Sequence, residues 1–146
     1  MYFTTAFGEN LIVEHIETAV EAAALETALA IGEFTASPVY PGEGRHAGLE
    51  LVIETDAPSP DTLARFAEIF DRSLKDQNVD YATKRGDDLG MAPPTITPVP
   101  RGAFHDWMAS RGKLGGQHKC PRCANHRDFT EGVSGFAESG QDAASI

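Results

Sequence analysis

The most constraining feature of the sequence is a change of apolar period between residues 48 and 74. In the run GLELVIET, which begins at Gly48, every second residue from 49 to 53 is Leu or Ile, as expected for a strand with two different faces. After Ser59 the spacing becomes three to four, which predicts a helix with one apolar face formed by Leu63, Phe66, Phe70 and Leu74. Ser59 can cap this helix, and Pro60 suits its first position. The chain therefore contains a strand followed closely by an amphipathic helix.

The other elements follow from the same two periods. We expect an extended segment at residues 1–7, a helix at 12–31 closed by Gly32, a strand at 33–41, a short helix at 78–85, a strand at 95–99, a helix at 102–110 and a strand or short helix near 122–129. Pro38 interrupts the strand at 33–41, so we expect that strand at a sheet edge or with a bulge. The order predicts an α+β fold, a small mixed β-sheet covered by helices.

The length of the chain indicates one domain. A chain of 146 residues usually forms a single core. From Gly132 the sequence is small and polar without periodicity. We therefore expect one domain over residues 1–131 and a disordered tail at 132–146.

Positive charge is concentrated between residues 101 and 127. The whole chain has 12 Lys and Arg against 22 Asp and Glu, a formal net charge of −10, which argues against a general binder of nucleic acid or anionic membranes. Between 101 and 127 a single acid, Asp106, is outnumbered by six basic residues: Arg101, Arg111, Lys113, Lys119, Arg122 and Arg127. This local excess needs a functional explanation.

Neither a targeting signal nor a membrane span is visible. Glu9 and Glu14 interrupt the region where a signal peptide has its apolar run, and no apolar stretch reaches about 18 residues. The two cysteines are too few for a disulfide framework. We expect a cytoplasmic, reduced setting and no membrane partner.

The glycine-rich run RGKLGGQHKCPR at residues 111–122 is the first candidate site. Gly115 and Gly116 allow the backbone to approach a ligand closely, and Lys119 and Arg122 supply positive charge. Such a loop can deliver a cation to a phosphate or a carboxylate, although its spacing is not that of a P-loop. The alternative is a solvated loop whose charges aid solubility.

The same region contains four potential metal ligands in the pattern H-x-C-x-x-C-x-x-H: His118, Cys120, Cys123 and His126. Strong zinc signatures pair a C-x-x-C with a distant second half, which this run lacks. We therefore expect no metal site, and a zinc or thiol-redox module stays as an alternative hypothesis. A serine hydrolase is disfavoured because no G-x-S-x-G elbow exists.

Three runs together resemble one protein family. GGQHKCPR resembles a motif of a small residue, Asn or Gln, Gln, an aromatic residue or His, Lys, any residue, Pro and Arg. QNVDYATKR resembles a Leu-Asn-x-x-Tyr-x-x-x-Arg helix, and GAFHDWMASRGK resembles a Gly-Thr-Phe helix that leads into the first motif. In their order along the chain, and together with the opening run FGENLIVEHIETAVEAA, they resemble the C-terminal domain of the Gretchen Hagen family of auxin-responsive acyl-acid amido synthetases, over about residues 3–127.

The resemblance implies membership of the acyl-adenylate-forming superfamily. A large N-terminal domain, in cis or in trans, would bind ATP with Mg²⁺ and a carboxylic acid, and a smaller C-terminal lid would rotate about a hinge close to residues 3–9. The acid would be activated as an acyl-AMP and then attacked by the amine of an amino acid. The chain alone would be an inactive part of an acid–amino acid ligase.

The resemblance also implies roles for individual residues. Lys119 matches the motif lysine and would be catalytic, stabilising negative charge on phosphate during adenylation. Gln117 would orient Lys119 or contact the nucleotide, Arg122 would hold the loop or reach phosphate, and Gly115 and Gly116 would line the nucleotide. The rival hypothesis is a stand-alone α+β module that binds a small molecule or a protein and has a regulatory role.

Overall fold

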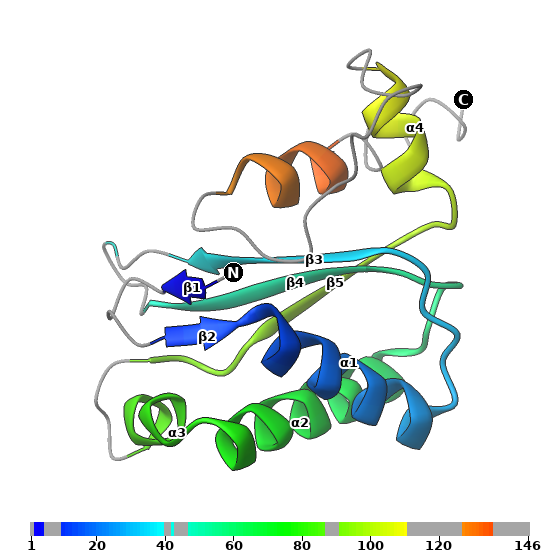
Figure 1. Cartoon of the computed structure of the whole chain (residues 1–146). Helices are drawn as coiled ribbons and strands as arrows, with labels where there is room; N and C mark the ends of the chain where they lie inside the picture. Colours follow the sequence, from blue (N-terminus) through cyan, green and yellow to red (C-terminus); the bar gives the residue numbers. More distant parts are fainter. Residues whose placement is uncertain are drawn as a thin grey trace.

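The fold, given by a computed structural model, is an α+β domain built around a small sheet. The structure describes residues 2–4, 10–39, 42, 47–86, 91–110 and 127–135. The elements in chain order are β1 (Tyr2–Thr4), β2 (Asn10–Ile12), α1 (Val13–Thr27), β3 (Phe34–Val39), β4 (Gly48–Glu54), α2 (Pro60–Gln77), α3 (Val79–Arg85), β5 (Thr95–Val99) and α4 (Ala103–Ser110). A further helix follows over residues 128–135. In Figure 1, α1 and α2 lie on one side of the sheet, and α4 and the orange helix of residues 128–135 lie on the other.

The main sheet is mixed, as predicted. Within the described residues its order is β3-β4-β5, with β3 antiparallel and β5 parallel to β4. Pro38 lies in the edge strand β3 and pairs with Leu49 in an unbroken register, so the edge position is confirmed and no bulge is needed. The parallel pair requires a crossover connection, and α2 and α3 provide it.

Helix α1 is shorter than predicted at both ends. Residues 10–12 pair with β1 instead of starting the helix. The helix ends at Thr27 because Ala28 takes a left-handed conformation with φ of 60°, and the Leu29 N–H bonds to the Ala24 carbonyl at 3.1 Å. This is the hydrogen-bond pattern of a Schellman cap. The prediction that Gly32 closes the helix was therefore wrong.

Helix α2 follows the sequence signals closely. The Ser59 hydroxyl accepts a hydrogen bond from the Thr62 N–H at 3.2 Å, and Pro60 begins the helix. Phe66 and Phe70 are fully buried with their rings stacked at 6.5 Å. They belong to a core that α1 and α2 form with one face of the sheet.

The sheet is buried on both faces, which the alternation in β4 did not predict. Leu51 and Ile53 face α1 and α2, whereas Val52 joins a second apolar cluster with Val99, Phe104 and other residues. Every residue of β4 except Glu50 is buried. The face that carries Glu50, Val52 and Glu54 is thus an interior surface.

The last helix corrects the boundary that we expected at residue 132. It continues to residue 135, and Val133 is fully buried in the second cluster. Phe129 and Val133 are one helical turn apart and both pack on that cluster, which explains why a short run with little apolar periodicity is helical. Residues 136–146 and 5–9 lie outside the described residues. None of the helices in the described part has the length and hydropathy of a membrane span.

Candidate functional site

The residues predicted for the site all fall in one segment of the chain. Gly115, Gly116, Gln117, Lys119 and Arg122 lie between residues 111 and 126, outside the described residues, as do the four potential metal ligands of the same run. The structure describes both flanks of this segment. On one side α4 ends at Ser110, and on the other the chain resumes at Arg127 and enters the helix at 128–135. We therefore build the candidate site from its two flanks.

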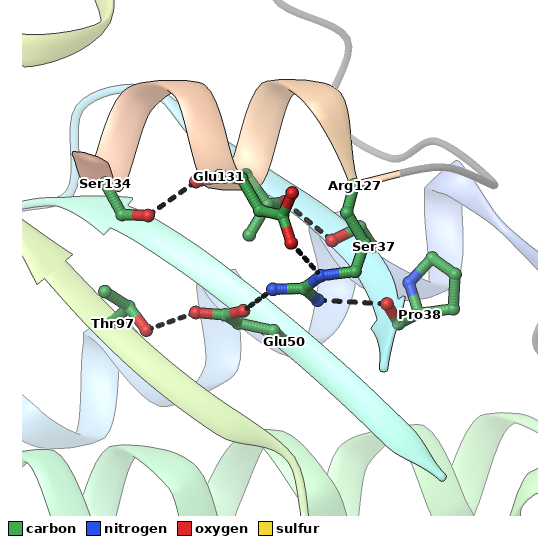
Figure 2. Close-up of polar contacts among 8 residues, drawn as sticks. Ser37, Pro38, Glu50, Thr97, Arg127, Glu131 and Ser134 are labelled. Atoms are coloured by element: carbon green, nitrogen blue, oxygen red, sulfur yellow. Dashed lines mark hydrogen bonds and ion pairs between the residues drawn. The ribbon is translucent and has the colours of Figure 1, made fainter. Parts of the chain in front are cut away.

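Arg127 is the anchor of the second flank. Its Nη1 donates to the Pro38 carbonyl oxygen at 3.0 Å, its Nη2 to Glu50 Oε1 at 2.5 Å, and its Nε to Glu131 Oε2 at 3.0 Å. Figure 2 shows this guanidinium between the strands and the helix. One side chain thus ties its own helix to the edge strand β3 and to the central strand β4.

Glu50 uses both of its carboxylate oxygens in this cluster. Oε1 accepts from Arg127, and Oε2 accepts from the Thr97 hydroxyl on β5 at 2.6 Å. The side chains of Arg127 and Glu50 are 24% and 14% exposed. Burial alone lowers the pKa of Arg127, but hydrogen bonds with Glu50 and Glu131 outweigh it and raise that pKa. The positive charge of Arg127 is therefore engaged by protein groups.

A second polar contact fixes the same helix along the sheet edge. The Ser37 hydroxyl bonds to the Thr130 hydroxyl at 2.7 Å, and this contact is buried. Ser134 in turn donates to the Thr130 carbonyl at 2.7 Å. Because buried hydroxyls must be paired, this contact specifies where the helix lies on β3.

Glu54 holds the first flank in a comparable way. Its side chain is buried, its Oε2 accepts from the Phe104 N–H in the first turn of α4 at 3.1 Å, and its Oε1 accepts from the Glu33 N–H at 3.3 Å. First-turn N–H groups lack partners within a helix and favour a carboxylate. Gly102 precedes α4 with φ of 89°, a conformation that suits glycine. Each flank is therefore attached to a glutamate on the same face of β4.

The two flanking helices also contact each other through apolar side chains. The rings of Trp107 and Phe129 meet edge to face at 5.8 Å. Gly132 lies so close to the indole that a Cβ at this position would overlap it. The two helices that flank residues 111–126 are therefore packed against each other.

The motif QNVDYATKR forms a separate, structural network. Asn78 Oδ1 caps α3 by accepting from the Tyr81 N–H at 2.9 Å. The Tyr81 hydroxyl donates to Asp71 Oδ1 at 2.6 Å, and Arg85 binds both Asp71 oxygens at 2.9 and 2.7 Å. Arg85 also donates to the Met91 carbonyl at 3.2 Å. The motif therefore joins α2, α3 and the chain that enters β5.

Burial and charge act in opposite directions within this network. Burial alone raises the pKa of Asp71, but the hydrogen bonds from Arg85 and Tyr81 and the charges of Arg85 and Lys75 outweigh it and hold that pKa below its ordinary value. Burial, with the nearby Asp71 charge, raises the pKa of Tyr81, which keeps its hydroxyl a proton donor. Asp71, Tyr81 and Arg85 bond to one another and to the chain at Met91, so this network holds the fold together.

The sequence analysis did not identify three residues that hold the flanks: Glu50, Glu54 and Thr97. The alternation of β4 suggested a polar outer face, and acids there are usually solvated. The spacing of Glu50 and Glu54 could have indicated that they act together, because residues four apart on a strand share a face. The local excess of basic residues that includes Arg127 then supplies a partner for Glu50.

Pockets in the described part of the chain lie away from Arg127 and Glu50, and a third besides the two described next, of about 530 Å³, lies around the end of α1. One, of about 610 Å³, lies beside α1 and includes Glu14, Glu17 and Glu21. The other, of about 510 Å³, lies at the carboxyl ends of β4 and β5 and includes Asp56 and Arg101. Among the described residues, no group of three or more His, Cys, Asp or Glu is placed to hold a metal ion.

Comparison with known proteins identifies the family of this chain. A sequence profile described as "GH3 family C-terminal domain" matches residues 14–128. The fold is similar to the solved structure "AtGH3.15 acyl acid amido synthetase in complex with 2,4-DB", with a TM-score of 0.78, 18% identity, and coverage of 93% of this chain and 26% of that one. A second structure, "GH3.15 acyl acid amido synthetase", gives a TM-score of 0.71 and 20% identity over 90% of this chain and 24% of that one.

The chain spans about a quarter of the length of these structures. At these identities the likeness shows the fold. No curated protein matches the sequence.

Proposed function

Because this chain belongs to the GH3 family as a C-terminal domain, we propose that it is the lid of an ATP-dependent acid–amino acid ligase. The resemblance drawn from the three sequence motifs is confirmed at the level of family and fold. The observation that carries the proposal is the extent of the family match, which covers residues 14–128 and so includes α4, the segment 111–126 and Arg127. A fold alone would not support an activity.

In the proposed reaction the substrate carboxylate first attacks the α-phosphate of ATP. A bond forms between the carboxylate oxygen and phosphorus, pyrophosphate leaves, and negative charge accumulates on the phosphate oxygens. The Lys119 ammonium stabilises that charge in the transition state. Gln117 orients Lys119 or contacts the nucleotide, Arg122 holds the loop or reaches phosphate, and the backbone at Gly115 and Gly116 approaches the nucleotide closely. An amino acid amine then attacks the acyl carbonyl, and AMP leaves.

The described residues support this role by fixing the flanks of the segment. A cation contributes most to catalysis when it is already held in place before the reaction. Glu50 and Glu54 attach the two flanks to one strand, and Trp107 with Phe129 joins the flanks to each other. Closure of such a lid would also exclude the water that hydrolyses an acyl-adenylate.

The proposed partner is a large adenylating domain, in cis or in trans, that binds ATP, the acid and the amino acid. Mg²⁺ would enter with ATP on the large domain. We propose a cytoplasmic setting, where ATP and free amino acids are available.

Reconstitution tests the proposal. The 146-residue chain, the large domain and the two together are supplied with ATP, Mg²⁺ and a panel of carboxylic and amino acids, and pyrophosphate release and amide formation are measured. We expect turnover with both parts and none with this chain alone. Turnover by this chain alone, or turnover by the large domain that the chain does not increase, would contradict the lid function.

A further inference from the structure

We propose that the pocket at the carboxyl ends of β4 and β5 is a binding site for a free apolar α-amino acid, held by Arg101 and Asp56. The pocket has a volume of about 510 Å³ and is lined by residues 55–58, which follow β4, and by residues 98–101, at the end of β5. All of its lining residues belong to the part of the chain that the structure describes. The site is independent of the ligase reaction proposed above, because binding to it requires neither ATP nor a large domain.

The topology of the sheet places this pocket where open α/β sheets bind ligands. β4 and β5 are parallel, so both carboxyl ends lie at the same end of the sheet. The chain leaving β4 enters α2 on one face, and the chain leaving β5 enters α4 on the other (Figure 1). Connections that leave neighbouring parallel strands toward opposite faces create a crevice that commonly binds a ligand. The Thr55 N–H donates to the Val99 carbonyl at 3.0 Å and joins the two segments that line this crevice.

Arg101 and Asp56 give the pocket a pair of opposite charges. Arg101 Nε donates to Asp56 Oδ1 at 3.1 Å, and the two side chains are 52% and 83% exposed. Within the described part of the chain, Nη1 and Nη2 of Arg101 have no protein acceptor and Asp56 Oδ2 has no protein donor. A guanidinium fork binds a carboxylate through two parallel hydrogen bonds, and a carboxylate oxygen accepts from an ammonium group. The pair can therefore bind both charged groups of one ligand.

This charge pair favours a zwitterion over a simple ion. A simple anion would be attracted by Arg101 and repelled by Asp56, and a simple cation would meet the reverse. A zwitterion is attracted by both side chains. Because the two side chains are in contact at 3.1 Å, the opposite charges of the ligand must also lie close together. An α-amino acid meets this condition, since a single carbon separates its carboxylate from its ammonium group.

The remaining lining residues indicate an apolar side chain on the ligand. Five of them carry neither charge nor a polar side chain: Ala57, Pro58, Pro98, Val99 and Pro100. Pockets of this volume, with apolar walls and a few polar groups, are typical of small-molecule sites. The three prolines restrict the backbone of the walls, so less conformational freedom is lost when a ligand binds. We therefore expect an apolar amino acid, and leucine is a suitable probe.

Titration of the 146-residue chain with L-leucine tests the site, with the backbone amide resonances followed by NMR. We expect saturable shifts at Thr55, Asp56, Ala57 and Arg101, with a Kd of about 1 mM. N-Acetyl-leucine has no ammonium group and leucinamide has no carboxylate, so each should bind about tenfold more weakly or worse. Glycine should also bind about tenfold more weakly, because it has no side chain to bury against the apolar walls.

Substitution of the charge pair tests which residues hold the ligand. Arg101→Gln and Asp56→Asn should each weaken leucine binding about tenfold, because each removes one of the two charged contacts. Both positions are exposed, so the amide spectrum away from the pocket should stay unchanged. Arg72→Gln and Asp76→Asn are the matched controls. They replace exposed residues of α2 that do not line the pocket, and they should leave the affinity for leucine unchanged.

Three results would overturn the proposal. The first is the absence of a saturable shift at roughly ten times the expected Kd. The second is equal affinity for leucine and for N-acetyl-leucine or leucinamide, which would show a site for a single charge. The third is undiminished binding in both Arg101→Gln and Asp56→Asn, which would place the ligand elsewhere. Because the titration contains no ATP and no large domain, its outcome is separate from that of the ligase reconstitution.

Discussion

The guanidinium of Arg127 and the carboxylate of Glu50 lie 2.5 Å apart although they are 77 residues apart in the sequence. This pair connects the last described helix to the central strand of the sheet. It lies on the same face of β4 as Glu54, which holds the start of α4. One strand therefore sets the positions of both helices that flank residues 111–126.

The pair should stabilise the fold measurably. Arg127→Gln and Glu50→Gln should each lower the free energy of unfolding by about 1–3 kcal/mol, because each leaves a largely buried charge without its partner. The double substitution should cost less than the sum, with a coupling energy of about 1 kcal/mol. Urea denaturation followed by the fluorescence of Trp107, the single tryptophan, measures these values.

The exposed pair Arg101–Asp56 serves as the control for that cycle. Its coupling energy should be below about 0.5 kcal/mol. Additive losses at Arg127 and Glu50, within the same limit, would show that the two side chains do not act as a pair.

The Asp71–Arg85 ion pair makes stability depend on pH. The folded pKa of Asp71 is below its ordinary value of 3.8, so its contribution is fully present above that value and is lost as the pH falls toward the folded pKa. Asp71→Asn should therefore lower the free energy of unfolding by about 2–4 kcal/mol at neutral pH, where it leaves Arg85 without its counter-ion. The difference from the original chain should shrink below about pH 4.

Urea denaturation across this pH range checks the Asp71 prediction. Asp76→Asn replaces an exposed carboxylate near the end of the same helix and is the matched control, with little effect expected at any pH. A difference for Asp71→Asn that stays constant from pH 7 to pH 3 would contradict a charge-based role.

Two glycines of the helix at 128–135 should respond in opposite ways to alanine. Gly132→Ala places a Cβ against the Trp107 indole and should lower the free energy of unfolding by about 1–3 kcal/mol. Gly135→Ala meets nothing within 4 Å and should be neutral or stabilising, by up to about 1 kcal/mol, because alanine favours a helix. Thermal unfolding of both variants and of the original chain measures these two changes in stability. Equal effects would mean that this helix does not pack on Trp107.

Local signals in the sequence predicted much of the fold. Ser59 and Pro60 marked the start of α2, and Pro38 indicated an edge strand. The mixed sheet and the positions of α3, β5 and α4 also follow from apolar spacing and prolines. These features are encoded within a few residues of where they act, so a pattern can reveal them.

Long-range contacts were less predictable. The end of α1 depends on the left-handed conformation of Ala28, a position where glycine is the usual signal. The helix at 128–135 depends on the burial of Val133 against Trp107 and its neighbours. From the sequence alone Glu50 is expected to be solvated, but in the fold its carboxylate pairs with Arg127. Partners 77 residues apart in sequence leave no local pattern.

The central claim is that Lys119 stabilises the adenylation transition state, and one comparison tests it most directly. In the ligase assembled with the large domain, Lys119→Ala should lower ATP–pyrophosphate exchange by roughly 10²–10³-fold, as expected for loss of a transition-state charge contact, and should affect amine attack on preformed acyl-AMP much less. Lys113→Ala, in the same segment, should change neither rate substantially. Equal losses in both half-reactions for Lys119→Ala would contradict the account.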